Sequence, residues 1–126
     1  MRKVLKKSLA TITAATMAVC MAATVSAKSE QYKVGKGTMT ATLDVSSSSA
    51  YASTSIDVGP CYVSVSIYGQ YYVKGTTTVR DYGNGNSSNT SGTEIRISNG
   101  GGTWIKVYST HSTTCGQDSK TVTLNW

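Results

Sequence analysis

The segment Cys61-Tyr62-Val63-Ser64-Val65-Ser66-Ile67 decides the fold. Apolar residues occupy every second position of this segment, and tyrosine or serine takes the positions between them. A period of two places alternate side chains on opposite faces of a β-strand, so the segment predicts a strand with one face in a core. Its first inward residue is a cysteine. We expect this to be the central strand of a small β-domain, joined covalently to the far end of the chain.

The N-terminus has the pattern of a secretory leader. A basic start at residues 1–7 precedes an apolar run, rich in small residues, that ends at Val25-Ser26-Ala27. The small residues there match a signal-peptidase site and predict cleavage after Ala27. We expect residues 1–27 to be a signal peptide and residues 28–126 to form a single secreted domain. A transmembrane anchor is the competing interpretation, but the run is rich in Thr and Ala, so we expect no stable anchor after leader removal.

Removal of the leader changes the charge of the protein. The full chain of 126 residues carries a formal net charge of +6. The leader contains Arg2, Lys3, Lys6 and Lys7, so residues 28–126 keep eight cations against six anions and a net charge of +2. These cations are scattered rather than gathered in a stripe. We therefore expect no nucleic-acid partner.

The cysteines predict one disulfide. Cys20 lies in the leader, and the exported part retains only Cys61 and Cys115. An even pair in an exported protein favours a disulfide, and this spacing suits a bridge between two sheets. Closing a loop of roughly 54 residues would stabilise the fold by about 4 kcal/mol. Two free thiols and the single histidine, His111, are too few for a zinc site, so we expect no metal and no cofactor.

Short alternating segments separated by turn residues fill the rest of the chain. The segments expected as strands are 38–45, 50–57, 61–68, 70–73, 76–82, 93–98, 103–111 and 120–126. Gly59-Pro60 and residues 99–102 are expected to be hairpin turns. Residues 83–92 contain no apolar side chain and are expected to be an irregular loop.

No helical period follows the leader, so the chain is predicted to be all-β. Seven or eight short strands favour an antiparallel β-sandwich of immunoglobulin-like architecture, with a small β-barrel as the alternative. The likeness to immunoglobulin domains is architectural only. Those domains have a tryptophan on the strand after the first cysteine, whereas Tyr71 or Tyr72 is the nearest aromatic residue here.

The aromatic residues give the best functional hint. The chain has eight tyrosines, two tryptophans and no phenylalanine. Tyr62 and Tyr68 take the face opposite the inward residues of 61–68, while Trp104 and Tyr108 take the face opposite Ile105 and Val107. If these strands share a sheet, the four rings form an exposed strip suited to sugar faces or partner surfaces. Tyrosine is also common on the wet side of sheets. A bulge that shifts the register would turn Trp104 inward.

Two other patterns resemble chemical sites less closely. His111 and Cys115 have the residue types of a Cys–His nucleophile pair, but a disulfide cysteine beside a surface histidine is the favoured interpretation. Residues 81–86 carry Asp and Asn at calcium-loop intervals. Glycines stand where the EF-hand pattern needs its third and twelfth ligands, at Gly83 and Gly92, so a flexible loop is favoured there too. We expect no catalytic residues.

These observations favour a secreted non-enzymatic module that binds an extracellular partner such as a glycan or a surface protein. The alternative is a small secreted effector of the bacteriocin or toxin type that acts on cell envelopes. Small size, export and mild positive charge agree with this alternative, although no amphipathic helix supports it.

Overall fold

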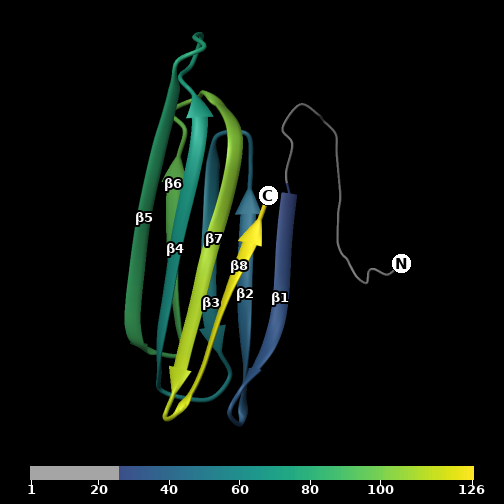
Figure 1. The fold of residues 1–126 in the computed structure, drawn as a ribbon, viewed down its shortest axis with the longest axis vertical. Helices are drawn as coiled ribbons and strands as arrows, with labels where there is room; N and C mark the ends of the chain where they lie inside the picture. Colours follow the sequence, from purple (N-terminus) through teal and green to yellow (C-terminus); the bar gives the residue numbers. More distant parts are fainter. Residues whose placement is uncertain (1–25) are drawn as a thin grey trace, which may run out of the picture.

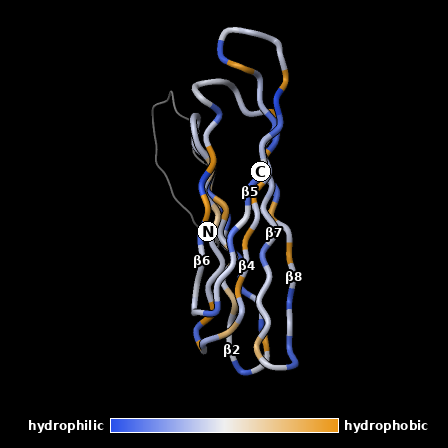
Figure 2. Tube along the Cα trace, turned by 90° about the vertical axis from the view of Figure 1, so that its left-hand side faces the viewer, coloured by the Kyte–Doolittle hydropathy of each residue, from blue (hydrophilic) through white to orange (hydrophobic). Residues whose placement is uncertain are grey.

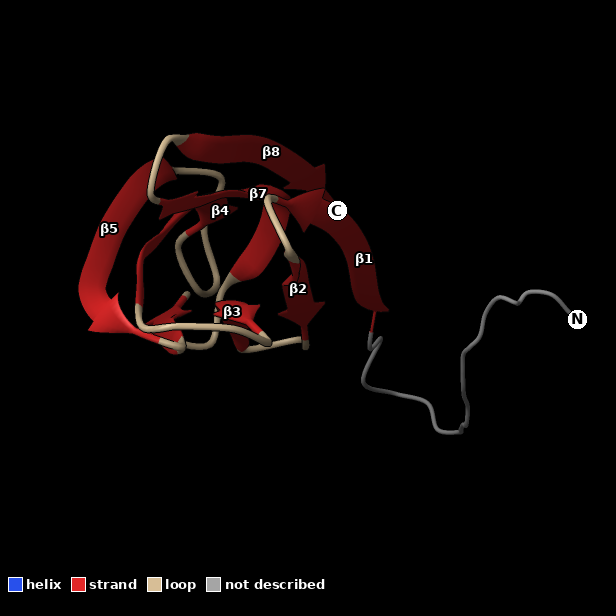
Figure 3. Ribbon diagram, turned by 90° about the horizontal axis from the view of Figure 1, so that it is seen from below, coloured by secondary structure: helices blue, strands red, loops and turns tan. Residues whose placement is uncertain are grey.

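The computed structural model describes residues 26–126, and in this range the chain forms two antiparallel sheets of four strands each (Figure 1). The strands are β1 (Ser26–Val34), β2 (Gly37–Val45), β3 (Ser49–Ile56), β4 (Cys61–Tyr72), β5 (Val79–Thr90), β6 (Gly92–Ser98), β7 (Thr103–Cys115) and β8 (Asp118–Asn125). Seen from below in Figure 3, β8, β7, β4 and β5 curve around the upper and left sides, and β3 lies on the lower side. The predicted all-β sandwich is confirmed, and its two sheets do not join into a closed barrel.

The strand order defines the topology. The first sheet has the order β1-β2-β3-β6, and the second sheet has the order β5-β4-β7-β8. The first three strands are therefore neighbours in sequence and in space, whereas the corresponding sheet of an immunoglobulin constant domain has the order A-B-E-D. β4 lies between β5 and β7, so the cysteine segment is an interior strand, as the sequence predicts.

Period-two alternation builds the core between the sheets. Burial alternates residue by residue along β2 and along most of β4. Met39 and Leu43 of β2 and Val63, Val65 and Ile67 of β4 all point into this interior, and each of the five is at most 2% exposed. Burying one such side chain contributes about 1.5–3 kcal/mol. Figure 2 shows hydrophobic and hydrophilic residues following one another along these strands.

Two segments expected as hairpins are crossovers between the sheets. β3 and β4 lie in different sheets, so residues 57–60 carry the chain from the first sheet to the second. Residues 99–102 likewise join β6 to β7. Asn99 is buried, and its Nδ2 donates to the Ser47 carbonyl at 2.9 Å, which ties this crossover to the β2–β3 turn. The hairpin predictions are wrong because turns and crossovers use the same Gly, Pro and Asn residues.

A β-bulge in β7 decides where the tryptophan points. The register between β4 and β7 shifts between Gln70 and Tyr71, which leaves Ile105 without a cross-strand partner. One extra residue exchanges the two faces of a strand. Trp104 is consequently 7% exposed, whereas Ile105 is 36% exposed. The expectation of an inward Ile105 and an outward Trp104 is wrong for this reason, and the bulge alternative is confirmed.

Gly69 leaves the space that Trp104 fills. A Cβ atom at Gly69 would lie 2.5 Å from Cζ3 of Trp104, so the indole ring packs directly on this backbone. The indole Nε1 donates to the Ser46 carbonyl at 3.0 Å, and the Tyr71 ring packs edge-on against it with centroids 5.7 Å apart. β4 continues without interruption past Gly69, where the sequence predicted a separate strand at 70–73.

The segment expected to be an irregular loop is most of strand β5. All twelve residues of β5 pair with β4. Nearly every β5 residue is exposed, so the strand contributes almost nothing to the core. The loop prediction is wrong because periodicity detects strands through their buried face, and β5 has none.

Two asparagines of β5 accept hydrogen bonds from its own backbone, and Nδ2 of Asn86 also donates to the Glu94 carbonyl of β6 at 3.2 Å. The N–H of Gly85 donates to Oδ1 of Asn84 at 2.8 Å, and the N–H of Ser87 donates to Oδ1 of Asn86 at 3.1 Å. Unpaired N–H groups on an edge strand would otherwise attract a further strand. These side chains therefore protect the edge of the second sheet.

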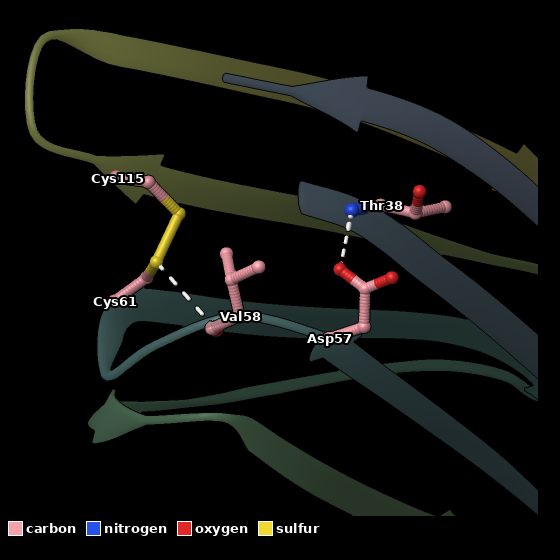
Figure 4. The surroundings of a disulfide bond; sticks show 5 residues. All are labelled: Thr38, Asp57, Val58, Cys61 and Cys115. Atoms are coloured by element: carbon pink, nitrogen blue, oxygen red, sulfur yellow. Dashed lines mark hydrogen bonds between the residues drawn. A yellow bond between two sulfur atoms is a disulfide. The ribbon is translucent and has the colours of Figure 1, made fainter. Parts of the chain in front are cut away.

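The predicted disulfide between Cys61 and Cys115 is present, but it lies elsewhere than expected (Figure 4). Cys61 begins β4 and Cys115 ends β7, which are neighbouring strands of the second sheet. Their Cα atoms are 4.9 Å apart. The expectation of a bridge between sheets is wrong, because the β4–β7 pairing brings the two cysteines together at one end of a single sheet. Beside this bridge, the Asp57 carboxylate accepts the Thr38 N–H at 2.6 Å.

Only the last two residues of the predicted leader fall within the described residues. Ser26 and Ala27 open β1 and pair with Val45 and Asp44. Residues 1–25, with the rest of the predicted signal peptide and Cys20, lie outside that range, so cleavage after Ala27 stays a prediction. Within residues 26–126, no helix is long and apolar enough to cross a membrane.

Candidate functional site

Three of the four predicted aromatic residues lie on the outer face of the second sheet. Tyr62 and Tyr68 alternate along β4 with buried apolar residues, and Tyr108 on β7 is the direct cross-strand partner of Tyr68. Trp104 does not join them, because the bulge places its side chain in the core. The exposed strip expected from the sequence therefore contains three tyrosines and no tryptophan.

Tyr68 and Tyr108 form a pair, which we call the tyrosine pair. Their ring centroids are 5.0 Å apart and the ring planes are inclined at 31°. Tyr62 is 48% exposed, but it lies six residues along β4 from Tyr68, or roughly 20 Å at the rise of a β-strand. The structure thus brings two of the predicted residues together and leaves the third apart.

Polar side chains border the tyrosine pair on one side. The next outward row of the sheet contains Asp81 on β5, Gln70 on β4 and Lys106 on β7. Nε2 of Gln70 donates to Oδ1 of Asp81 at 3.0 Å. Loss of solvation raises the pKa of Tyr68, and hydrogen bonding to Asp81 and its negative charge raise that pKa further. The Tyr68 hydroxyl therefore stays protonated at neutral pH and can act as a donor.

On the β8 side, Asn125 is the cross-strand partner of Tyr108, and the Lys28 ammonium donates to the Asn125 carbonyl. Gly83 of β5 is the cross-strand partner of Tyr68, and a Cβ atom at this position would lie 3.9 Å from Cδ2 of the Tyr68 ring. Toward the disulfide, the outer face carries short hydroxyl residues from β4, β7 and β8. They are Ser64, Ser66, Thr110, Ser112, Thr121 and Thr123. The pair therefore lies between a polar, charged row and a flat field of hydroxyl groups.

The first sheet offers a useful contrast at Tyr51. Its hydroxyl donates to Oε1 of Glu94 at 2.7 Å, and the Arg96 guanidinium carbon lies 5.1 Å from the ring centroid. Burial raises the pKa of the neighbouring Asp44, and the charge of Arg96 partly opposes this rise. Tyr51 thus contacts both a carboxylate and a guanidinium, whereas Tyr68 pairs with the Tyr108 ring and hydrogen-bonds to Asp81.

His111 lies in the core and not on the surface, contrary to the sequence expectation. It is fully buried, with Nδ1 2.8 Å from Oγ1 of Thr54 and Nε2 2.7 Å from Oγ of Ser109. The Thr54 hydroxyl donates to the Ser64 carbonyl, which assigns the imidazole proton to Nδ1 and makes Ser109 the donor to Nε2. Burial lowers the pKa of His111 to about 4, so the ring is neutral at physiological pH.

The two weaker patterns do not form sites in the described residues. The sulfur of Cys115 is bonded to Cys61, so it provides no free thiol to His111. Asp81 and Asn84 belong to an extended strand and point to opposite faces, which separates the expected calcium ligands. Within residues 26–126, no group of three or more His, Cys, Asp or Glu side chains is placed to hold a metal ion.

Sequence reasoning missed the residues that surround the tyrosine pair. Gln70 and Asp81 lie in segments predicted as separate strands and Gly83 lies in the predicted loop, so no sequence pattern connects these residues to Tyr68. The pairing of β4 with β5 is what brings them together. No protein-family model matches the sequence, and no curated protein or solved structure matches it significantly.

Proposed function

We propose that this protein is a secreted, non-enzymatic β-sandwich module that binds an extracellular glycan through the outer face of its second sheet. The observation that carries the proposal is the tyrosine pair, with ring centroids 5.0 Å apart on an outward row that ends in glycine. Aromatic rings with polar tips pack against the apolar C–H faces of sugars, while their hydroxyl groups hydrogen-bond at the rim. Tyr68 and Tyr108 offer both kinds of surface.

The neighbours of the tyrosine pair support a hydroxyl-rich ligand. Asp81 accepts hydrogen bonds from Gln70 and from the Tyr68 hydroxyl, and a carboxylate has further lone pairs for sugar hydroxyls. Serines and threonines cover the adjoining rows and can both donate and accept. A small disulfide-bonded domain is typical of exported proteins, which supports an extracellular ligand.

A glycan fits this face better than a surface protein does. A stable protein interface buries about 800 Å² on each partner around a central apolar cluster. The outer face of the second sheet provides one aromatic pair between a charged row and small hydroxyl residues, and Tyr62 lies apart from it. Such a face can hold a sugar ring without a large apolar centre.

One observation favours the second candidate, an envelope-active effector. Tyr72 and Val79 are cross-strand partners at the far end of the second sheet and are 40% and 47% exposed. Exposed Lys74 follows in the connecting turn. Aromatic and basic residues together favour contact with anionic lipid surfaces. Leakage from vesicles of phosphatidylglycerol, lost in Tyr72→Ser, would support this candidate, and intact vesicles would remove it.

Glycan binding is tested with leader-free protein on an array of bacterial, plant and animal glycans. We expect Tyr68→Ala and Tyr108→Ala each to weaken binding by about tenfold or more, the effect of removing an aromatic hot spot. Tyr51→Ala is the matched control, because it removes a tyrosine from the outer face of the other sheet. Absence of binding by the wild-type protein, or equal loss in Tyr51→Ala, would contradict the proposal.

A further inference from the structure

The tyrosine pair brings two oxidisable rings into contact on the surface of the protein. Tyr68 and Tyr108 are direct cross-strand partners, and their ring centroids lie 5.0 Å apart with the ring planes inclined at 31°. Among residues 26–126, no second pair of tyrosine rings makes such a contact. Both rings are half-buried on the outer face of the second sheet, so each keeps a surface that is open to solvent.

The pairing of β4 with β7 holds the two rings within reach of a covalent bond. The register between these strands is unbroken from Tyr62 to Gln70, which includes the tyrosine pair. Directly opposed residues of an antiparallel pair have Cβ atoms about 4.5–5.5 Å apart. The edges of the two rings can therefore meet by rotation about side-chain bonds, while the backbone of the sheet stays in place.

Asp81 provides a proton acceptor for one of the two rings. Its carboxylate accepts the Tyr68 hydroxyl, and Nε2 of Gln70 donates to its Oδ1 at 3.0 Å and so orients it. Loss of an electron makes a phenol strongly acidic, so a phenol is oxidised most easily where a base takes its proton at the same time. A carboxylate in hydrogen-bond contact with the hydroxyl is such a base. We therefore expect Tyr68 to be oxidised first.

Tyr51 on the other sheet shows what the tyrosine pair adds. Its hydroxyl also donates to a carboxylate, that of Glu94, at 2.7 Å. The group against its ring is the Arg96 guanidinium, 5.1 Å from the ring centroid, and not a second phenol. Tyr51 thus has a proton acceptor but no partner with which a radical could couple, whereas Tyr68 has both.

We propose that the tyrosine pair is a site of oxidative cross-linking, at which a haem peroxidase and hydrogen peroxide join Tyr68 to Tyr108 as dityrosine. Each ring gives up one electron and its phenolic proton, and the two radicals couple through the ring carbons next to the hydroxyl-bearing carbons. The hydrogen on each coupled carbon then moves to the oxygen, which restores both phenols. One hydrogen peroxide accepts the two electrons and two protons and becomes two water molecules, so the protein loses two hydrogen atoms.

The cross-link would be the second covalent bond between β4 and β7. The disulfide joins these strands at Cys61 and Cys115, roughly 23 Å along β4 from the tyrosine pair. Thiols do not break a carbon–carbon bond, so the second link would persist where the disulfide is reduced. Disulfide-bonded domains are typical of oxidising surroundings, in which such chemistry can occur. The inference is independent of glycan binding, because it requires only the two rings and the oxidant.

Treatment of the leader-free protein with a haem peroxidase and hydrogen peroxide tests the site. We expect a monomeric product that has the fluorescence of dityrosine and a mass lower by two hydrogen atoms. The disulfide must be reduced and alkylated before digestion with trypsin, because it joins the same two peptides, 37–74 and 107–120. Tandem mass spectrometry should then find these peptides still linked, through Tyr68 and Tyr108.

Conservative variants identify the residues that react. Tyr68→Phe and Tyr108→Phe keep a ring for packing and should each abolish the monomeric product. Tyr62→Phe is the matched control and should leave the yield unchanged, because Tyr62 lies on the same face and is 48% exposed but is roughly 20 Å from the pair. Asp81→Asn should slow the reaction by about tenfold or more, because an amide does not take up the phenolic proton.

The outcomes that contradict the site are distinct from those that contradict glycan binding. Intermolecular dimers as the sole product, or an undiminished monomeric product in Tyr68→Phe, would overturn the cross-linking site. An unchanged rate in Asp81→Asn would overturn the role of Asp81. Glycan arrays are read without oxidant, so their result bears on the proposed function alone.

Discussion

Acid should destabilise this protein through one residue, the buried His111. Its imidazole lies between Thr54 of the first sheet and Ser109 of the second, with no exposed surface. Burial lowers its pKa from the ordinary 6.5 to about 4. One pKa unit corresponds to about 1.36 kcal/mol, so the difference corresponds to about 3 kcal/mol of folding free energy.

The sign of the pH dependence follows from which state of the chain, folded or unfolded, binds the proton. Below pH 6.5 the unfolded chain binds a proton at His111, while the folded protein does not bind it until the pH approaches about 4. The stabilisation is therefore fully present above pH 6.5 and is lost as the pH falls through this window, by about 1.4 kcal/mol per pH unit. Burial raises the pKa of Asp44, which adds stability to the folded state as the pH falls and partly offsets the loss.

Urea denaturation of the disulfide-bonded protein at several pH values between about 7 and about 4 measures this slope. His111→Gln is the matched variant, because its amide can donate to Thr54 and accept from Ser109 without titrating. We expect the wild type to lose about 3 kcal/mol more than the variant across this range. Equal slopes would refute the reasoning. The Cε1 proton of this single histidine gives a direct NMR titration, and a pKa near 6.5 would refute it independently.

Three further changes have defined outcomes. Replacing Cys61 and Cys115 together by alanine should lower the free energy of unfolding by about 4 kcal/mol, measured by denaturation, because their bridge closes a loop of 54 residues; an unchanged midpoint would contradict this. Gly69→Ala should cost about 1–3 kcal/mol in a thermal melt, because its methyl group overlaps the Trp104 ring; a stability gain would show that the ring can move. Tyr62→Ala should leave glycan affinity unchanged, since it lies roughly 20 Å from the tyrosine pair; a tenfold loss would extend the site.

The sequence predicted the parts of this fold that touch the core. Alternation along β2 and β4 identifies Leu43 and Val65 as inward residues, and both are buried. The same alternation places Tyr68 and Tyr108 on an outward face, and the structure places them there. Such residues are predictable because burial on one face imposes a period of two on the sequence.

The remaining features depend on contacts between distant segments. Trp104 points inward because of a bulge in β7, and no residue pattern in this run of β-forming residues indicates where the bulge lies. His111 is polar by type but acceptable in the core, because Thr54, 57 residues away in the sequence, provides a hydrogen-bond partner. The order of the strands also decides which distant residues meet, as Cys61 and Cys115 do, and local sequence patterns do not contain that order.

Strand β5 has an unusual freedom within this fold. Its backbone is fixed by the ladder with β4, yet almost none of its side chains supports the interior. Substitutions along it can therefore change the chemistry of the outer surface while the hydrophobic core remains intact. In evolution or in the laboratory, this strand can be varied as freely as a surface loop, on a backbone that the sheet holds in place.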